Sequence, residues 1–245
     1  MARIFITGSA DGLGQLAAKA LIAQGNQVVL HARNDRRGHE ALDKVRGAES
    51  VVTADLRNID EVKQLASKVN ALARFDAVIH NAGVYNVSSN EIFTVNTLAP
   101  YLLTCLIQRP KRLIYLSSGM HLQGSSKLES FKTNISRITY SDSKLHVLML
   151  CMSVARKWQS VYTNAVDPGW VPTKMGGQGA PDDLQKGYET QVWLAASNDE
   201  KAKVSGRYFH HKKESSHNPE ADDASLQDTF LSMCEEITGI SFPSG

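Results

Sequence analysis

Tyr140 and Lys144 are the two residues of this chain whose types and spacing most clearly suggest chemistry. They stand four positions apart at the start of a long apolar stretch, and on a helix this spacing places both side chains on one face. A free tyrosine titrates near pH ~10, so it exchanges protons poorly at neutral pH unless a positive charge is close. We therefore expect the Lys144 ammonium to lower the pKa of the Tyr140 phenol. The alternative is a tyrosine packed on the core and a lysine extended along the surface.

A glycine-rich turn follows the first apolar run of the chain. Residues 3–6 read as a strand, and Thr7-Gly8-Ser9-Ala10-Asp11-Gly12-Leu13-Gly14 leads from it into a helical pattern. Glycines allow a tight turn and a close backbone approach to a ligand, while the start of a helix presents unpaired N–H groups and a positive dipole end. Between a strand and a helix, this turn predicts binding of a dinucleotide pyrophosphate; elsewhere it would be only a turn.

Short apolar runs alternate with helical patterns along most of the chain. Such runs, separated by helices, are typical of a parallel sheet buried on both faces. The expected strands cover 3–6, 27–32, 51–54, 77–80, 113–116 and 163–166, and the expected helices cover 12–24, 36–46, 58–72, 90–108, 138–158 and 224–238. The fold class is therefore α/β: a Rossmann-type doubly wound parallel sheet with helices on both faces, in three αβα layers.

The 245 residues read as one NAD(P)-binding domain, because no repeat or linker divides them and this length suits a single core. Segments 119–137 and 170–187 follow strands at the carboxyl edge, where ligands of open α/β sheets bind, so we expect them to line the substrate pocket. The second contains three glycines and resembles a lid. Residues 210–245 form a C-terminal extension, in which 210–223 is expected to be a solvated loop.

Composition excludes several classes of function. The formal charge is +2 and no long basic run occurs, so we expect no nucleic-acid partner. No apolar run is long enough to span a membrane, and Met1 leads within two residues into the first strand, which leaves no room for a signal peptide. We therefore expect a soluble, cytoplasmic protein.

Cysteines and histidines do not suggest a metal site. The three cysteines are far apart in apolar helical stretches, which indicates buried free thiols. Four histidines in polar segments have irregular spacing, so we expect them at the surface and predict no metal. His31 and His80, at strand ends, are expected to be satisfied core or rim residues, and the backbone of His80 could also touch the cofactor. The cysteines are Cys105, Cys151 and Cys234, and the four histidines are His121, His210, His211 and His217.

The residue after the second strand bears on the cofactor. An acidic residue there would bind the ribose hydroxyls of NAD, whereas this chain has Arg33, which suits the 2′-phosphate of NADP. Arg36 and Arg37 add positive charge nearby, although all three could be ordinary surface charges. Asp11 in the glycine turn could repel a phosphate unless its side chain points away. The residues favour NADP(H) over NAD(H).

Taken in order, these motifs resemble the short-chain dehydrogenase/reductase family, in its single-domain branch. Besides the glycine turn and the Tyr140–Lys144 pair, the resemblance rests on Asn81-Ala82-Gly83, Asn96, Ser118 and the loop from Pro168 to Thr173. The long gap between Ser118 and Tyr140, and the sequence at 205–209, are similar to the retinol dehydrogenase and WW-domain oxidoreductase members. His80 departs from the family, which often has asparagine there.

The resemblance implies roles for these residues. Tyr140 would be the general acid/base, Lys144 would hold the nicotinamide ribose, and Ser118 would bond the substrate oxygen. Asn96 would bind a water linked to Lys144, or would be a satisfied structural asparagine. The catalytic residues would be Asn96, Ser118, Tyr140 and Lys144, and the cofactor residues would be Gly8, Ser9, Ala10, Asp11, Gly12, Leu13, Gly14, Arg33, Asp55, Leu56, Asn81, Ala82, Gly83, Tyr140, Lys144, Pro168, Gly169, Val171 and Thr173.

The expected function is an NADP(H)-dependent oxidoreductase that interconverts an alcohol and a carbonyl compound. Apolar residues in the two pocket segments favour a bulky aldehyde, ketone or alcohol, although they could simply cover the core. A non-catalytic dinucleotide-sensing protein stays open, while a sugar-nucleotide epimerase would need a larger C-terminal domain. The family commonly pairs helices 90–108 and 138–158 into homodimers or homotetramers; a monomer also stays open.

Overall fold

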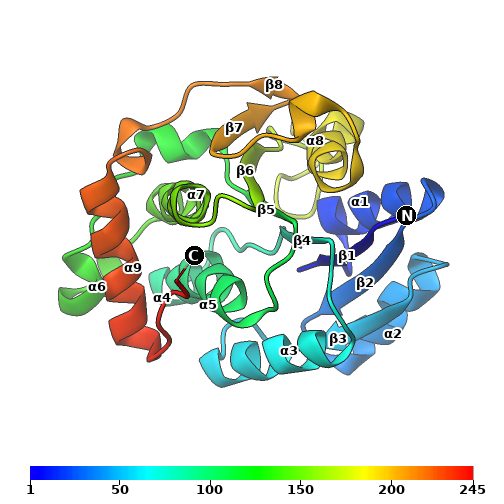
Figure 1. Ribbon diagram of the computed structural model, residues 1–245, viewed down its shortest axis with the longest axis horizontal. Helices are drawn as coiled ribbons and strands as arrows, with labels where there is room; N and C mark the ends of the chain where they lie inside the picture. The colour runs from blue at the N-terminus through cyan, green and yellow to red at the C-terminus, as the bar shows by residue number, and fades with distance from the viewer. Residues whose placement is uncertain (245) are drawn as a thin grey trace.

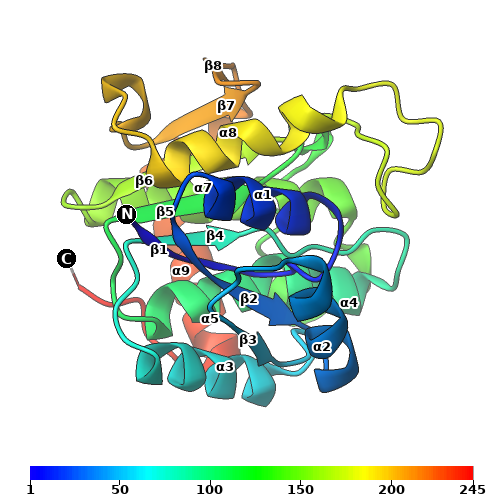
Figure 2. The same cartoon turned by 90° about the vertical axis from the view of Figure 1, so that its right-hand side faces the viewer.

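The computed structural model describes residues 1–244, and these form a twisted sheet with helices on both faces (Figures 1 and 2). The sheet has eight strands in the order β3-β2-β1-β4-β5-β6-β7-β8. All neighbouring strands are parallel except β7 and β8, which are antiparallel. The strands are β1 (Arg3–Ile6), β2 (Gln27–Ala32), β3 (Ser50–Thr53), β4 (Ala77–His80), β5 (Arg112–Leu116), β6 (Tyr162–Asp167), β7 (Arg207–His210) and β8 (Lys213–Glu214).

Two apolar clusters fill the space on either side of the sheet. One cluster joins the sheet to α1, α2 and α8, and the other joins it to α3, α5, α7 and α9. This confirms the three-layer α/β fold. The α-helices are α1 (Gly12–Ala23), α2 (Asp35–Lys44), α3 (Ile59–Ala71), α4 (Ser89–Ile92), α5 (Ala99–Leu106), α6 (Ser130–Thr133), α7 (Tyr140–Lys157), α8 (Leu184–Ala196) and α9 (Ala224–Thr238).

The expected helix over 90–108 is not continuous. A π-helical segment, η1 (Phe93–Leu98), separates α4 from α5. A π segment widens the helix locally and often marks a functional site. It contains Asn96, so the interruption falls at one of the predicted site residues.

The sequence pattern missed several elements in the second half of the chain, among them α8, β7 and β8. Helix α8 begins at Leu184, within the expected lid segment, and strands β7 and β8 lie where the solvated loop over 210–223 was expected to begin. Phe209 and Tyr208 are buried although β7 is short and flanked by polar residues. The hairpin turns at His211 and Lys212, which both have positive φ.

Helix α7 is enclosed by its own chain. Residues 142–154 are all buried, and α9 packs along the side of α7 that faces away from the sheet (Figure 1). Pairing of α7 with a second copy would therefore require α9 to move. Within residues 1–244, no helix is long and apolar enough to cross a membrane.

The three cysteines are free, with Cys151 and Cys234 buried and Cys105 half-buried. No group of three or more metal-binding side chains occurs among residues 1–244. The expectation of a surface position is wrong for His121, whose exposed fraction is 0%. It lies under the C-terminal extension, which the sequence pattern did not place.

Candidate active site

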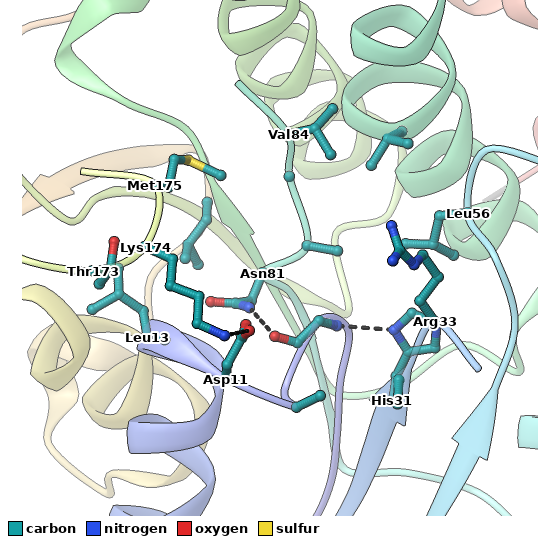
Figure 3. A pocket seen from close by; sticks show the side chains of 18 of the residues that line it. Asp11, Leu13, His31, Arg33, Leu56, Asn81, Val84, Thr173, Lys174 and Met175 are labelled. Carbon is teal, nitrogen blue, oxygen red and sulfur yellow. Dashed lines mark hydrogen bonds and ion pairs between the residues drawn. The ribbon is translucent and has the colours of Figure 1, made fainter. Parts of the chain in front are cut away.

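A cleft of about 400 Å³ opens at the carboxyl edge of the parallel strands (Figure 3). The turn between β1 and α1 lines one side of it, and the first turn of α7 lines its far end. Because parallel strands all end at this edge, segments distant in sequence converge here. The predicted residues that line the cleft are Gly8, Ala10, Asp11, Gly12, Leu13, Arg33, Asp55, Leu56, Asn81, Ala82, Gly83, Tyr140, Lys144, Pro168 and Thr173.

The glycine turn packs closely against Asn81 and Ala82, which directly follow β4. Gly8 has φ +64°, and a Cβ there would meet the Ala82 backbone. A Cβ on Gly14 would clash with the Asn81 amide, which donates hydrogen bonds of 2.9 and 3.2 Å to the carbonyls of Thr7 and Gly8. Glycine is therefore required at both positions by close backbone approach.

His31 supports the same turn from β2. Its Nδ1 accepts a 2.9 Å hydrogen bond from the Gly8 N–H, and its Nε2 lies 3.0 Å from the carbonyl oxygen of Ala54. Nε2 must therefore carry the proton. Burial lowers the pKa of His31 to about 4, which keeps the ring neutral. The expectation of a satisfied core or rim residue is confirmed for His31 but not for His80, which is buried with no hydrogen-bond partner for its Nδ1 among residues 1–244.

Helix α1 begins without a side-chain cap. Asp11 occupies the N-cap position and makes no capping hydrogen bond. The first-turn N–H groups of Gly12 and Leu13 are thus without a side-chain partner at the cleft, where an anionic group fits. These features are compatible with the pyrophosphate of a dinucleotide.

The Asp11 carboxylate is directed toward two cations. Its Oδ2 lies 3.3 Å from Lys174 Nζ (Figure 3) and 2.5 Å from Arg37 Nη2. These charges hold the Asp11 pKa below its usual range against the effect of burial. Arg36 instead pairs with Glu40 at 2.7 Å. The cations that line the cleft are Arg33, Arg37, Arg57, Lys144 and Lys174, and Lys174 was not predicted.

Asp55 and Leu56 line the cleft after β3. Asp55 is paired with Arg57 at 2.6 Å, and this hydrogen bond holds the Asp55 pKa below its usual range. The positive charge of Arg33 acts in the same direction. Leu56 is buried and supplies an apolar surface to this part of the cleft.

Lys144 lies on the face of the Tyr140 ring. Its Nζ is 5.4 Å from the ring centroid and donates a 2.8 Å hydrogen bond to the carbonyl of Leu116 at the end of β5. Only 5% of Lys144 is exposed, so the alternative of a surface lysine is wrong. The Tyr85 ring packs edge-on against the Tyr140 ring, and the two ring centroids are 4.8 Å apart.

The expected effect of Lys144 on Tyr140 is absent in the protein alone. Burial raises the pKa of Tyr140 to about 12, a rise that Ser118 opposes through a hydrogen bond and the Asp167 carboxylate increases. Burial lowers the pKa of Lys144 to about 8, opposed by the charge of Asp167. The expectation of an acidic phenol is therefore wrong in direction, because desolvation outweighs a cation placed over the ring.

Asn96 spans the gap between η1 and the loop after β4. Its Oδ1 accepts from the Val84 N–H at 2.8 Å, and its Nδ2 donates to the Val84 carbonyl and to Ser143 Oγ, both at 3.0 Å. A Cβ on Gly83 would lie 3.4 Å from both Asn96 Oδ1 and Lys144 Nζ, so these two side chains face each other across Gly83. Every polar atom of the Asn96 amide thus has a protein partner.

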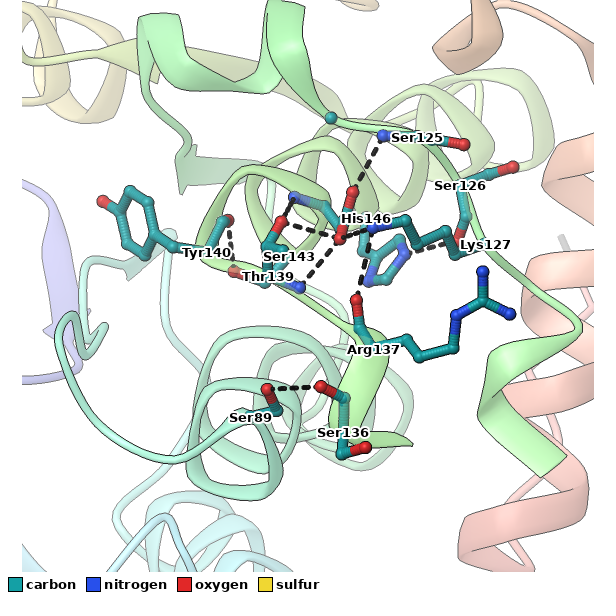
Figure 4. Close-up of polar contacts among 12 residues, drawn as sticks. Ser89, Ser125, Ser126, Lys127, Ser136, Arg137, Thr139, Tyr140, Ser143 and His146 are labelled. Carbon is teal, nitrogen blue, oxygen red and sulfur yellow. Dashed lines mark hydrogen bonds and ion pairs between the residues drawn. The ribbon is translucent and has the colours of Figure 1, made fainter. Parts of the chain in front are cut away.

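A buried carboxylate fixes the start of α7. Asp142 accepts hydrogen bonds from the Thr139 N–H at 2.8 Å, the Ser125 N–H at 2.9 Å and Lys127 Nζ at 2.8 Å, and Thr139 caps the helix in return (Figure 4). These partners hold the Asp142 pKa below its usual range. The segment 119–137 is therefore attached to the helix that carries Tyr140.

The loop after β6 lines a further side of the cleft. Asp182 accepts a 2.6 Å hydrogen bond from the Trp170 N–H, and the Trp170 indole donates to the Gly176 carbonyl at 2.8 Å. Thr173, Lys174 and Met175 line the cleft. Predicted residues that are not part of the cleft lining are Ser9, Gly14, Asn96, Ser118, Gly169 and Val171.

These latter residues are all buried or half-buried. Ser9 is buried and hydrogen-bonds Ile6 and His31, while Val171 is buried against the start of α8. Ser118 is half-buried beside Tyr140. Pattern reasoning missed Tyr85 and Lys174, since neither belongs to a motif with fixed spacing.

Comparison with known proteins gives a consistent result. The family model described as short chain dehydrogenase matches residues 2–183. Over the whole of both chains, the protein is 42% identical to "Uncharacterized oxidoreductase AN7799" of Emericella nidulans and 40% identical to "Short-chain dehydrogenase chyC" of Penicillium rubens. It is 27% identical to retinol dehydrogenase 14 of Mus musculus, with 97% of this chain and 86% of the relative covered.

Solved structures show the same fold. An uncharacterised protein from Mycobacterium paratuberculosis superposes with a TM-score of 0.84 at 23% identity, covering 99% of this chain and 95% of the other. A short-chain dehydrogenase of Shigella flexneri in complex with NADP superposes with a TM-score of 0.67 at 21% identity, covering 86% and 97%.

Proposed function

Because the chain belongs to the short-chain dehydrogenase family, and is thus an oxidoreductase acting on CH–OH groups, we propose that it interconverts an alcohol and a carbonyl compound with NADP(H), using Tyr140 as general acid/base. The observation that carries this proposal is the composition of one cleft. The glycine turn and Arg33 line it together with Tyr140 and Lys144, so one dinucleotide could extend between them.

The proposed cofactor position follows from the groups along the cleft. The uncapped start of α1 would bind the pyrophosphate, and Lys144 would bind the nicotinamide ribose hydroxyls. When bound, the nicotinamide accepts or supplies the hydride. Asn81 and His31 hold the turn in the shape that leaves room for the dinucleotide.

Proton transfer is assigned to Tyr140. In the reducing direction its hydroxyl would give a proton to the substrate oxygen, and in the oxidising direction the phenolate would take it back. Ser118 would donate a hydrogen bond to the same oxygen and stabilise negative charge that develops there. A pKa of about 12 in the protein alone means that the phenolate needs stabilisation beyond what Lys144 gives, which the positive charge of the oxidised nicotinamide would supply.

NADP(H) is favoured by charge. Arg33 lines the cleft after β2, and no acidic residue occupies that position. A guanidinium can bind a 2′-phosphate through paired hydrogen bonds. The NADP complex of the Shigella flexneri protein is consistent with this choice.

The proposed substrate is apolar and of some bulk. Large hydrophobic side chains are exposed on the two segments expected to line the substrate pocket, and their exposed fractions are 37% for Met120, 56% for Leu122, 60% for Trp170 and 47% for Met175. An apolar surface of this kind favours a hydrophobic ligand. The mouse relative is named a retinol dehydrogenase, and retinol is an alcohol of this apolar, bulky class.

The test is a panel of bulky and small aldehydes, ketones and alcohols, followed by cofactor absorbance with NADP(H) and NAD(H). We expect turnover with NADP(H) on bulky members and its loss in Tyr140→Phe. Turnover that survives in Tyr140→Phe would exclude the proposed acid/base. Binding of NADPH without turnover of any member would favour a non-catalytic dinucleotide sensor.

A further inference from the structure

His121 lies in the segment that follows β5, three residues after Ser118, and both of its ring nitrogens have partners. Nδ1 is 2.6 Å from the Ser118 carbonyl oxygen, and Nε2 is 3.2 Å from the backbone nitrogen of Asn218. The Asn218 N–H can only donate, so Nε2 must accept and Nδ1 must carry the proton. The ring is fully buried, and its geometry therefore selects one neutral tautomer.

The Ser118 carbonyl receives two hydrogen bonds from the same residue. In addition to the His121 ring, the His121 backbone N–H donates to it at 3.0 Å. Two donors on one carbonyl fix the peptide plane between Ser118 and Gly119. They thereby fix the direction in which the Ser118 side chain leaves the backbone.

Asn218 is itself fastened to the segment after β5. Its side-chain amide donates to the carbonyls of Gly124 at 3.1 Å and His121 at 3.4 Å. Nearby, Glu220 accepts a 2.8 Å hydrogen bond from the Ser126 N–H. These contacts come from the part of the chain beyond residue 183, where the match to the family model ends.

We propose that His121 and Asn218 form a positioning unit that holds Ser118 in the orientation required to bond the substrate oxygen. This inference rests on the proposed function, since it assigns Ser118 that role. The C-terminal extension then takes part in catalysis indirectly, through one buried imidazole. His121 is a positioning residue, because it touches Ser118 and not the substrate.

A proton on Nε2 would disrupt this unit. The protonated ring would direct its Nε2–H at the Asn218 N–H, and the Asn218 N–H would lose the nitrogen that accepts its hydrogen bond. The groups that face the ring are Tyr208, packed edge-on at 4.7 Å, His217, whose charge disfavours protonation, and Asp167, whose charge favours it. Burial is the largest influence and lowers the His121 pKa below its usual value.

The experiment compares Ser118→Ala, His121→Ala and His121→Asn for kcat, KM and cofactor Kd across pH. An asparagine amide can reach the position of Nδ1 and keep the hydrogen bond to the Ser118 carbonyl, without a titratable group. We expect kcat to fall on the order of tenfold to a hundredfold in His121→Ala at unchanged cofactor Kd. We expect His121→Asn to recover most of this loss.

The pH profile separates positioning from mere structural support. The wild-type kcat should fall on the acid side, at a pH below the usual histidine pKa, as Nε2 gains its proton. This limb should be absent in His121→Asn and retained in His39→Asn, a matched change at an exposed histidine of α2 that lies outside the unit. An acid limb that persists in His121→Asn would overturn the proposal.

Two variants at Asn218 test the contact between its backbone nitrogen and Nε2. Asn218 has φ −65°, which proline can adopt, so Asn218→Pro replaces the N–H by a ring carbon against the imidazole, whereas Asn218→Ala keeps the N–H. Both variants lose the side-chain amide. We expect kcat to be lower in Asn218→Pro than in Asn218→Ala; equal values would contradict the inference.

The outcomes distinguish the positioning unit from the proposed function on which it rests. If Ser118→Ala keeps wild-type turnover, the proposed role of Ser118 fails. If Ser118→Ala loses turnover but His121→Ala does not, only the positioning unit fails. A parallel loss of kcat and cofactor affinity in His121→Ala would show general structural damage and would also overturn it.

Discussion

Lys174 and Asp11 form an ion pair across the dinucleotide cleft, with Nζ and Oδ2 3.3 Å apart. Lys174 belongs to the loop after β6, whereas Asp11 lies in the glycine turn after β1 (Figure 3). The Asp11 carboxylate also holds Arg37 at 2.5 Å. An anionic cofactor entering here would compete with Asp11 for both cations.

Replacement of Asp11 by asparagine should therefore strengthen binding of NADPH. The change removes one negative charge beside the phosphates and releases Arg37 and Lys174 to bind them. We expect the Kd for NADPH to fall by roughly threefold to tenfold at low salt, and less at high salt because screening weakens the effect. Fluorescence titration at two ionic strengths measures this Kd. A higher Kd in Asp11→Asn would show that Asp11 does not compete with the cofactor for the two cations.

Arg33→Ala tests the phosphate assignment. Loss of a charge-assisted hydrogen bond costs about 1.5 to 3 kcal/mol, so we expect kcat/KM for NADPH to fall by about 10- to 100-fold and that for NADH to stay the same. Arg36→Ala is the matched control, because Arg36 pairs with Glu40 and does not line the cleft. An unchanged ratio of the two efficiencies in Arg33→Ala would exclude this role for Arg33.

Tyr140→Phe should abolish proton transfer and retain cofactor binding. Removal of a general acid/base typically costs 10²- to 10⁴-fold in rate, and we expect a loss of about this size in kcat. Tyr85→Phe is the control, because it removes a hydroxyl from the ring packed against Tyr140. Steady-state kinetics with NADPH fluorescence titration separates the two effects.

Lys144→Met should raise stability while it removes activity. The folded-state pKa of Lys144 is about 8, below its usual value, so the unfolded chain binds more protons between about pH 8 and pH 10.5. Stability of the wild type should therefore rise with pH through this window. Lys144→Met should lack this rise and should gain about 1 to 3 kcal/mol at pH 7.

Urea unfolding of wild type and Lys144→Met at several pH values between 7 and 10 measures the difference. Other titrating groups contribute equally to both proteins and cancel in the comparison. Parallel pH profiles for the two proteins would show that burial of this ammonium carries no cost.

Asp142→Asn should destabilise the protein and loosen the start of α7. The change leaves Lys127 and the Thr139 N–H without the buried carboxylate that they pair with, which costs about 2 to 4 kcal/mol. The folded pKa of Asp142 is depressed, so its stabilisation is present above the usual aspartate pKa and is lost as pH falls through the folded value. Asp60→Asn, at an exposed aspartate in the first turn of α3, is the matched control.

Much of the fold was predictable from residue pattern. Strands β1, β2 and β4 begin and end where the apolar runs do, and helices α1, α3, α7 and α9 agree within two residues with their expected bounds. These elements are buried on one or more faces, so their apolar periodicity is strong. Helix α8 and strand β7 were missed because their flanking residues are polar or glycine-rich, which weakens the same signal.

The features of the site also divide into those that the sequence predicts and those that only the structure shows. The glycine turn, Asn81 and the Tyr140–Lys144 pair were predictable because their geometry is local, or is set by the ends of adjacent parallel strands. The burial of His121, the direction of the Asp11 carboxylate and the pKa of Tyr140 were not. Each depends on a segment far away in the sequence.

The sequence by itself determined the fold class, the dinucleotide-binding turn and the residue types available for proton transfer. The tertiary structure alone decided their electrostatic state. Desolvation depends on everything packed around a group, so only the folded chain reveals that Tyr140 is a weak acid and Lys144 a weak base in the protein alone. For the same reason, only the folded chain places Asn218 against the histidine that holds Ser118.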